Sequence, residues 1–349
     1  MESDNHTETN VEIDDYIHHR VEQDLDGRHR VRSALHARRT VMAVCLALMI
    51  VVGVLIVVFT VGGVQSKTGE NGGNKGQGVP VHLQEGGWVN DANGNKYQIL
   101  GVYKRTSTHY TQGLIWDDGR ILESGGLYGQ SSIHYLNIDQ DNRKIDLGQN
   151  TFTGSQYFGE GIDKIFVNGT YNIYQLTWRE NKIFVYDTDL KLVKTLDKPS
   201  QVLEGWGLTH RPSSPCDLII SDSSDVLKVV DCNTMQVKES LAIQKGDYRL
   251  PSINELQFVD DYLVANVYLS KNIEIIDLEL KKSIRTLDMR ELLDRANVER
   301  MDRGLGNLDY GECLNGIAYD DKNKEFWITG KDWPLFFKIK FPEEYFKKQ

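Results

Sequence analysis

The sequence predicts an all-β domain, a five-bladed β-propeller, that is preceded by one N-terminal transmembrane helix. Residues 41–64 form an apolar run without a charged side chain, and short alternating strand patterns fill the chain beyond residue 88. One strand-turn-strand unit recurs five times there, and repeats of this kind are typical of propeller blades. We therefore expect a tail over 1–40, a helix over 41–64, a stalk over 65–88 and the propeller over 89–349.

The N-terminal region carries the signals of a membrane anchor. As a helix, residues 41–64 would be roughly 36 Å long, against roughly 30 Å for the hydrocarbon core of a bilayer. Arginines cluster just before this run, whereas only Lys67 and Lys75 follow it closely, so residues 1–40 should stay in the cytoplasm. That tail is rich in charge and is expected to be disordered. These features predict an uncleaved signal-anchor and a single-pass type II membrane protein of the secretory pathway.

Local signals on the luminal side predict two covalent features. Asn168 begins the sequon Asn-Gly-Thr in a predicted loop and is therefore the expected glycosylation site, whereas the glycine-rich residues 65–88 should be a flexible stalk. Cys216 and Cys232 flank a strand, a polar turn and a second strand. In a symmetric hairpin they would lie opposite each other, at bonding distance. A disulfide and a pair of buried thiols both remain open.

The five repeat units give the propeller its predicted blades. The units begin at Gly113, Gly161, Gly207, Glu255 and Gly316. The first three intervals are 48, 46 and 48 residues, and the last is 61 because of an insertion with helical character around Met289–Val298. The segment Lys96–Lys104 reads as a strand ahead of the first unit. We expect it to complete the last blade, which would close the ring and remove an exposed edge.

Polar and aromatic residues recur ahead of the first strand and after the second strand of each unit. A propeller brings such equivalent positions together at one mouth of its central channel. Singly, each residue could serve only in packing or in a turn. Together they predict an apolar pocket with a few polar groups, which is typical of a binding site. The residues are Tyr110, Gln112, Phe158, Glu160, Trp178, Trp206, Asn254, Tyr268, Asn315, Lys331 and Trp333.

The segments around these residues resemble, in order, the motifs of plant and bacterial glutaminyl cyclases, also called glutamine cyclotransferases. The motifs are YTQGL (110–114), ESGGLYGQSSI (123–133), YFGEGI (157–162), LTWRE (176–180), EGWGLT (204–209), INEL (253–256), ANVY (265–268), LNGIAYD (314–320) and TGKDWP (329–334). The resemblance covers about residues 95–341, with at least one motif in each predicted blade. It departs at Tyr110, where the family usually has Phe, and at Tyr268, where many members have Trp.

The resemblance implies an acyltransferase, a glutaminyl-peptide cyclotransferase. Enzymes of this family convert the N-terminal glutamine of peptides and proteins to pyroglutamate and release ammonia. The substrate's own α-amine attacks its γ-amide, so no serine or cysteine nucleophile is needed. The family is not known for a catalytic metal, and the motifs contain no His or Cys cluster with the spacing of a zinc site. No cofactor and no metal are therefore expected. A net charge of −10 disfavours a nucleic-acid partner.

The chemistry of this reaction, together with the resemblance, predicts a role for each residue. A buried carboxylate has a raised pKa and can both accept and return a proton, which makes Glu160 the predicted acid/base. Lys331 and Asn254 are the predicted donors to the oxyanion. The other pocket residues should bind the substrate and exclude water. These are Gln112, Tyr110, Phe158, Trp178, Trp206, Tyr268, Trp333 and Asn315.

Two other functions remain open at this stage. A propeller ectodomain that only binds a peptide or protein ligand would need no acid, ammonium or carboxamide, yet all three groups are present here. A calcium-dependent hydrolase or lactonase would need several oxygen ligands on one cation. Glu160, Asn254, Glu255 and Asn315 could supply those oxygens. Turnover of a glutamine-initiated peptide in the presence of a chelator separates these alternatives from a cyclase.

Overall fold

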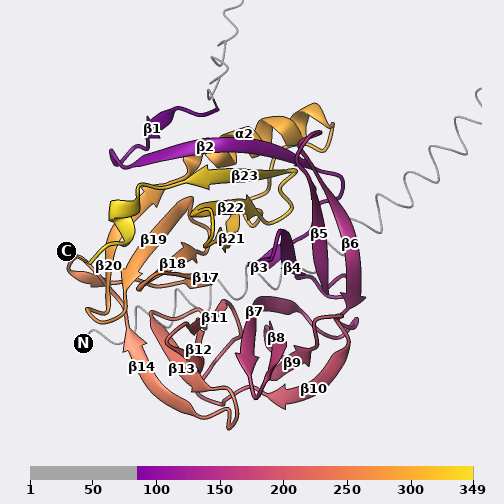
Figure 1. The fold of residues 1–349 in the computed structure, drawn as a ribbon, viewed down its shortest axis with the longest axis vertical. Coiled ribbons are helices and arrows are strands. Elements are labelled where there is room, and N and C mark those ends of the chain that lie inside the picture. Colours follow the sequence, from indigo (N-terminus) through magenta and orange to yellow (C-terminus); the bar gives the residue numbers. More distant parts are fainter. Residues whose placement is uncertain (1–84, 349) are drawn as a thin grey trace, which may run out of the picture. The chain divides into compact units, whose positions relative to one another are not determined.

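The computed structural model describes residues 85–348, and nearly all of their regular structure is β-strand (Figure 1). The helical segments in this range are α2 (Arg290–Asp302) and the short 3-10 helix η1 (Glu343–Phe346). The predicted all-β class is confirmed for this part of the chain. Within it, no helix has both the length and the apolar character needed to cross a bilayer. The predicted cytoplasmic tail, membrane helix and all but the last four residues of the stalk lie outside the described residues.

The strands form four hydrogen-bonded sheets. The largest runs β21-β22-β23-β2-β6-β5-β4-β3, with β1 paired to β2. Its strands are β1 (Trp88–Asn90), β2 (Lys96–Arg105), β3 (Thr111–Asp117), β4 (Arg120–Gly125), β5 (Ser132–Asp139), β6 (Lys144–Phe152), β21 (Leu314–Asp320), β22 (Glu325–Gly330) and β23 (Leu335–Lys340). Because β2 and β6 pair in parallel only at Lys104↔Lys144 and Arg105↔Ile145, this sheet divides into two antiparallel sets of four long strands.

The other three sheets contain the middle of the chain. Their orders are β10-β9-β8-β7, β11-β12-β13-β14 and β16-β15-β20-β19-β18-β17. Their strands are β7 (Gly159–Val167), β8 (Thr170–Thr177), β9 (Lys182–Tyr186), β10 (Leu192–Asp197), β11 (Leu208–Arg211), β12 (Ser214–Ile220), β13 (Val226–Asp231), β14 (Val237–Ala242), β15 (Gln244–Lys245), β16 (Tyr248–Arg249), β17 (Ile253–Val259), β18 (Tyr262–Val267), β19 (Asn272–Asp277) and β20 (Lys282–Asp288). Each of these sheets thus contributes one more antiparallel set of four consecutive strands.

The ends of the domain meet in the largest sheet. The early strand β2 pairs antiparallel with β23, the last strand, over Gln98↔Lys340 to Lys104↔Leu335. This pairing confirms the prediction that Lys96–Lys104 is a strand that completes the last repeat unit. The predicted helix of the insertion is also present as α2. It packs the buried side chains of Leu292 and Ala296 into a core cluster that contains Trp333 and Phe337.

The opening strand of each set lies closest to the common centre (Figure 1). These strands contact one another in the order β3, β7, β11, β17, β21 and again β3. The approach is so close that the glycine opening a repeat is required: an added Cβ at Gly161 would lie 2.5 Å from the Trp206 carbonyl oxygen, and one at Gly113 would lie 2.7 Å from the Ile162 nitrogen. The glycines that open these repeats therefore allow neighbouring sets of strands to pack closely against each other.

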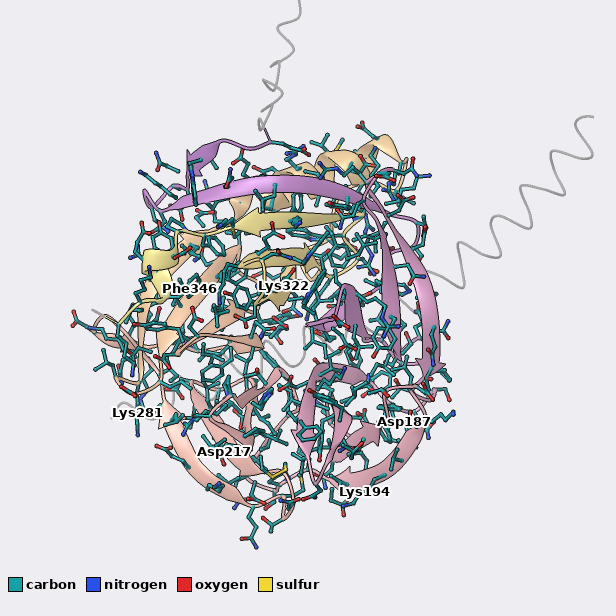
Figure 2. The ribbon with its side chains drawn as sticks, viewed as in Figure 1. Asp187, Lys194, Asp217, Lys281, Lys322 and Phe346 are labelled. Atoms are coloured by element: carbon teal, nitrogen blue, oxygen red, sulfur yellow. A yellow bond between two sulfur atoms is a disulfide. The ribbon has the colours of Figure 1, made fainter. Side chains whose placement is uncertain are left out.

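Two sequence signals on the outer parts of the domain have clear structural positions. Cys216 and Cys232 form a disulfide with Cα atoms 4.9 Å apart (Figure 2). The β12–β13 register pairs Asp217 with Asp231, so the cysteines lie opposite each other one position further along the hairpin. Asn168 is exposed in the two-residue turn between β7 and β8, a position that an attached glycan could occupy without displacing buried groups. Cys313 is a free, buried thiol.

Candidate active site

The predicted polar and aromatic residues gather at one end of the opening strands. Gln112, Glu160, Asn254 and Asn315 lie at or next to the first residues of β3, β7, β17 and β21, and Trp206 lies two residues before β11. The second strand of each set runs back toward this same end. Trp178, Tyr268 and Lys331 are each the first residue after such a strand. The closed series of contacts between the opening strands therefore brings together segments that are up to about 220 residues apart in the sequence.

A buried carboxamide-carboxylate pair forms the polar centre of this site. The Gln112 side chain donates a hydrogen bond from Nε2 to Oε1 of Glu160, over 3.1 Å. On its other side, Oε1 of Gln112 lies 3.5 Å from Nδ2 of Asn315, which also donates to the Thr111 carbonyl at 2.9 Å. All three side chains are buried. Gln112 is thus held on both sides, and it orients one oxygen of Glu160.

Aromatic rings surround this polar centre. Phe158, two residues before Glu160, lies with its ring centroid 5.5 Å from that of Trp178 and 6.2 Å from that of Tyr110. The Phe158 ring fits against the backbone of Gly126, where an added Cβ would lie 2.5 Å from Cε1. Trp206 packs on Tyr268 at 5.3 Å. Rings from four different sets thus enclose the carboxylate in an apolar wall.

Lys331 places an ammonium group between two of these rings. Its Nζ lies 5.0 Å from the centre of the Tyr110 ring and 4.7 Å from that of Tyr268, which are cation–π distances. Its backbone N–H donates to the carbonyl of Cys313 at 2.9 Å, which fixes the start of the loop that carries it. The side chain is only 3% exposed. A buried ammonium held by ring faces keeps its N–H donors for another partner.

The surroundings favour the uncharged forms of both Glu160 and Lys331. Burial raises the pKa of Glu160 well above its usual range, against the opposing effect of the Lys331 charge, and the neighbouring Glu204 and Glu180 raise it further. Burial lowers the pKa of Lys331, against the stabilising charge of Glu160. A carboxyl group with a raised pKa exchanges protons more readily near neutral pH, which suits a general acid/base.

Several buried polar atoms near this end have no hydrogen-bond partner among residues 85–348. They include Oδ1 of Asn254, Oδ1 of Asn315, Nδ2 of Asn266 and Oε2 of Glu255. The other oxygen of Glu255 accepts from the backbone N–H of Leu114 at 3.4 Å, so this carboxyl group binds strand backbone. Buried polar atoms normally have partners. The unmatched carboxamides at this end are therefore positioned to bind a polar ligand.

The chain is similar to known proteins in both sequence and fold. Residues 80–341 match the family model described as glutamine cyclotransferase. The chain belongs to the glutamine cyclotransferase family. A glutaminyl-peptide cyclotransferase of Arabidopsis thaliana is 27% identical to it over 250 residues, which are 71% of this chain and 72% of the relative. The fold is similar to the crystal structure of Myxococcus xanthus glutaminyl cyclase, with a TM-score of 0.59 and 24% identity over 70% of this chain and 95% of that one.

In this member of the glutamine cyclotransferase family, Trp333 does not have the position expected for a pocket wall. It is fully buried and belongs to the hydrophobic cluster beneath α2, with its ring 6.3 Å from that of Phe337. Its indole N–H donates to the carbonyl of Glu312 at 2.9 Å. The ring also fills the space above Gly330. Trp333 therefore serves core packing, because it has no exposed surface and its neighbours belong to the hydrophobic cluster with Leu292 and Ala296.

The structure gives a place in the site to three residues that the sequence puts near the same mouth but to which the predicted mechanism assigns no role. Tyr128 packs on Phe158 at 5.4 Å, and its hydroxyl donates to Oε1 of Glu180 at 2.6 Å. Glu204 accepts from the indole of Trp206 at 2.9 Å and from Arg179 at 2.8 Å. All three residues lie inside the motifs quoted above, so the sequence contained a signal for their presence at the site. Their effect is electrostatic as well as structural, since both glutamates raise the pKa of Glu160.

One grouping in this family member has the composition of a metal site. Among residues 85–348, His109, Glu123 and His134 place their ligand atoms within 4.8 Å of one another. However, an Arg105 guanidinium nitrogen lies 2.5 Å from Oε2 of Glu123 and another lies 3.0 Å from Oε1. A fixed positive charge therefore already occupies the position next to this carboxylate. The grouping is an ion-paired network, and a cation there would meet strong repulsion.

Proposed function

We propose that this protein is a glutaminyl-peptide cyclotransferase, which converts the N-terminal glutamine of peptides and proteins to pyroglutamate with release of ammonia. The observation that carries the proposal is the buried Glu160 carboxyl group, oriented by Gln112 inside an aromatic wall that also holds the Lys331 ammonium. Membership of the glutamine cyclotransferase family and the name of the Arabidopsis relative support the same activity.

In the proposed mechanism the substrate supplies its own nucleophile. Glu160 accepts a proton from the α-ammonium group, and the freed amine attacks the γ-carbonyl carbon to form the ring C–N bond. The carbonyl oxygen becomes an oxyanion, which Lys331 and Asn254 stabilise with N–H donors. Glu160 then returns a proton to the amide nitrogen. The C–N bond to that nitrogen breaks and ammonia leaves. The ammonia takes the remaining extra proton from the ring nitrogen, so the products are the neutral lactam and ammonium, and Glu160 is again a carboxylate.

The rings have two tasks in this mechanism. Phe158, Trp178 and Trp206 exclude water, which keeps the pKa of Glu160 high and strengthens the interaction of the oxyanion with its donors. They also restrict the flexible glutamine side chain to conformations in which the amine approaches the γ-carbonyl. Gln112 and Asn315 offer amide groups that can bind the carboxamide of the substrate. Tyr110 and Tyr268 hold the Lys331 ammonium in place.

The test is ammonia release by the purified protein from a peptide that begins with glutamine. We expect turnover, together with a product whose mass has fallen by that of ammonia. The same peptide with an acetylated α-amine has no nucleophile and should not react. Turnover should persist in a chelator. A protein that binds the free peptide but releases no ammonia is a binding module, and loss of activity in the chelator favours the calcium-dependent alternative.

The geometry gives little support to a calcium-dependent hydrolase. Glu160 binds the side chain of Gln112, whereas Glu255 accepts the backbone N–H of Leu114. The two carboxyl groups therefore serve different partners, while a calcium site needs oxygens that converge on one ion. The cyclase therefore remains the better function for this site.

We also propose that residues 89–349 form a five-bladed β-propeller. Five antiparallel sets of four strands support this architecture: β3–β6, β7–β10, β11–β14, β17–β20, and β21–β23 with β2. Their opening strands contact each other in a closed order. In such a propeller the parallel contact of β2 with β6 is the seam between the last blade and the first. The location of the site at one end of the opening strands then corresponds to one mouth of the central channel.

For the remainder of the chain we propose a type II membrane protein of the secretory pathway. The support is the apolar run at 41–64 with arginines on its N-terminal side. Residues 1–40 would be cytoplasmic, residues 65–88 a stalk, and the catalytic domain luminal or extracellular. A disulfide between Cys216 and Cys232 suits an oxidising compartment, and Asn168 would carry a glycan there. Glycosidase treatment of the protein from a eukaryotic host tests the orientation, because an unshifted band contradicts it.

A further inference from the structure

We propose that Glu123 is a positioning residue for the cyclisation: paired with Arg105, it fixes Thr111, and through Thr111 it holds Gln112 and Asn315 against Glu160. This inference rests on the proposed function and assigns a role to a buried network outside the pocket. Arg105 lies in β2 and Glu123 in β4, so the network spans the seam between the first and the last set of strands.

The network is fully satisfied and almost completely buried. Glu123 is 0% exposed and Arg105 is 2% exposed, and the two groups make a bidentate pair. Nε2 of His134 lies 2.7 Å from Oε2 of Glu123, and the Thr111 hydroxyl donates to Oε1. A buried ion pair is weak evidence for stability, since apolar residues of similar volume often serve as well. Apolar residues could not, however, reproduce the hydrogen-bond geometry of the Arg105–Glu123 pair.

A continuous path of hydrogen bonds leads from Glu123 to the proposed acid/base. The Thr111 side chain bonds to Glu123, while its carbonyl accepts from Nδ2 of Asn315 at 2.9 Å. That nitrogen lies 3.5 Å from Oε1 of Gln112, and Gln112 donates to Glu160 at 3.1 Å. Thr111 also precedes Gln112 directly in β3. A shift of the Thr111 backbone would therefore move Gln112 and Asn315 together.

A second path leads from the same ion pair to the loop that carries Lys331. An Arg105 guanidinium nitrogen lies 2.7 Å from Nδ1 of His109, and arginine can only donate, so this nitrogen is an acceptor. The His109 carbonyl accepts the backbone N–H of Thr111 at 2.9 Å and that of Asp332 at 2.8 Å. Asp332 follows Lys331. The network therefore fixes the carboxamide pair and the ammonium-bearing loop relative to one another.

The competing interpretation is that the network only stabilises the seam. Thr111→Val and Thr111→Ser separate the two roles, because valine keeps the shape and loses the hydroxyl whereas serine keeps the hydroxyl. A matched control exists in β19 and β20. There, Glu274 is buried, pairs with Lys245 at 2.6 Å and accepts the Thr286 hydroxyl at 2.8 Å. Thr286→Val removes the same kind of bond outside the proposed site.

The experiment measures kcat, KM, the pH profile and the melting temperature of the full chain with a glutamine-initiated peptide. We expect Thr111→Val to lower kcat about 10-fold to 100-fold, as small misplacements do, with little change in KM. The acidic limb of kcat/KM should move to higher pH, because a loosened Gln112 stabilises the Glu160 carboxylate less well. Thr111→Ser should restore most of the rate, and Thr286→Val should lower only the melting temperature.

Four outcomes would overturn the proposal. If folded Thr111→Val turns over like the wild type, or if Thr111→Ser is equally slow, the hydroxyl is not the link to Glu160. If Thr286→Val slows turnover as much as Thr111→Val, the effect is one of stability alone. A wild-type protein that releases no ammonia removes the proposed function and the positioning role with it, so the two failures are distinguishable. Should Thr111→Val not fold, Glu123→Gln is measured in the same way against Glu274→Gln.

Discussion

Gln112 donates a hydrogen bond to Glu160 across the contact between β3 and β7, with Nε2 3.1 Å from Oε1. This one bond joins the opening strands of two neighbouring sets and fixes the orientation of a buried carboxyl group. Because the bond depends on close approach of the strands at Gly113, the repeated glycines of the sequence and the chemistry of the site are parts of one arrangement.

Glu160→Gln should reduce kcat by at least about 100-fold, because an amide neither accepts nor returns the proton. Thermal stability should stay equal or rise at neutral pH, since burial raises the pKa of Glu160 and the folded protein must otherwise bury a carboxylate. Ammonia release and calorimetry measure the two effects. The control is Glu274→Gln, a buried substitution outside the site. Similar turnover by Glu160→Gln and the wild type removes Glu160 from the mechanism.

Lys331→Met should move the acidic limb of kcat/KM to higher pH in addition to slowing the reaction. Burial raises the pKa of Glu160 and the Lys331 charge opposes this rise, so loss of the charge leaves the pKa higher still. The base form of Glu160 then appears only at higher pH. Residual rates measured across the pH range test this. Lys338→Met, which removes a lysine of β23 that pairs with Glu325 of β22, should leave the profile unchanged.

Asn254→Leu should lower kcat/KM by about 100-fold, the typical effect of losing one oxyanion donor, without lowering the melting temperature. Oδ1 of Asn254 is buried without a partner among the described residues, and such an atom costs about 1–3 kcal/mol. Leucine removes that cost. Parallel kinetics and thermal melts provide the test. A marked loss of stability with intact turnover would show that Asn254 serves the fold.

Reduction of the Cys216–Cys232 disulfide should lower stability without changing turnover. The bond closes a loop with a sequence separation of 16, and a loop of that size contributes about 3 kcal/mol. In a domain of this size that corresponds to about 6–12 °C in melting temperature. The Cys216→Ser/Cys232→Ser double variant should melt early but keep the wild-type kcat. A selective fall in kcat at temperatures where the variant is folded contradicts this.

The sequence by itself determined the strands, the repeat and the family. These follow from local patterns: alternating apolar residues, a glycine that opens most units, and motifs short enough to be read along the chain. The symmetry of the predicted hairpin likewise placed Cys216 opposite Cys232, because register in a short hairpin is a local property. Most of the residues predicted for the pocket also gather at one end of the opening strands.

Only the tertiary structure decided which side chains meet. Trp333 shares a motif with Lys331, yet its ring lies in the core beneath α2 while the lysine lies between Tyr110 and Tyr268. The pairing of Arg105 with Glu123 depends on β2 returning to the last set of strands, which no local pattern specifies. The physical reason is that backbone preferences act over a few residues. Burial, charge pairing and proton affinity instead depend on neighbours that are distant in the chain.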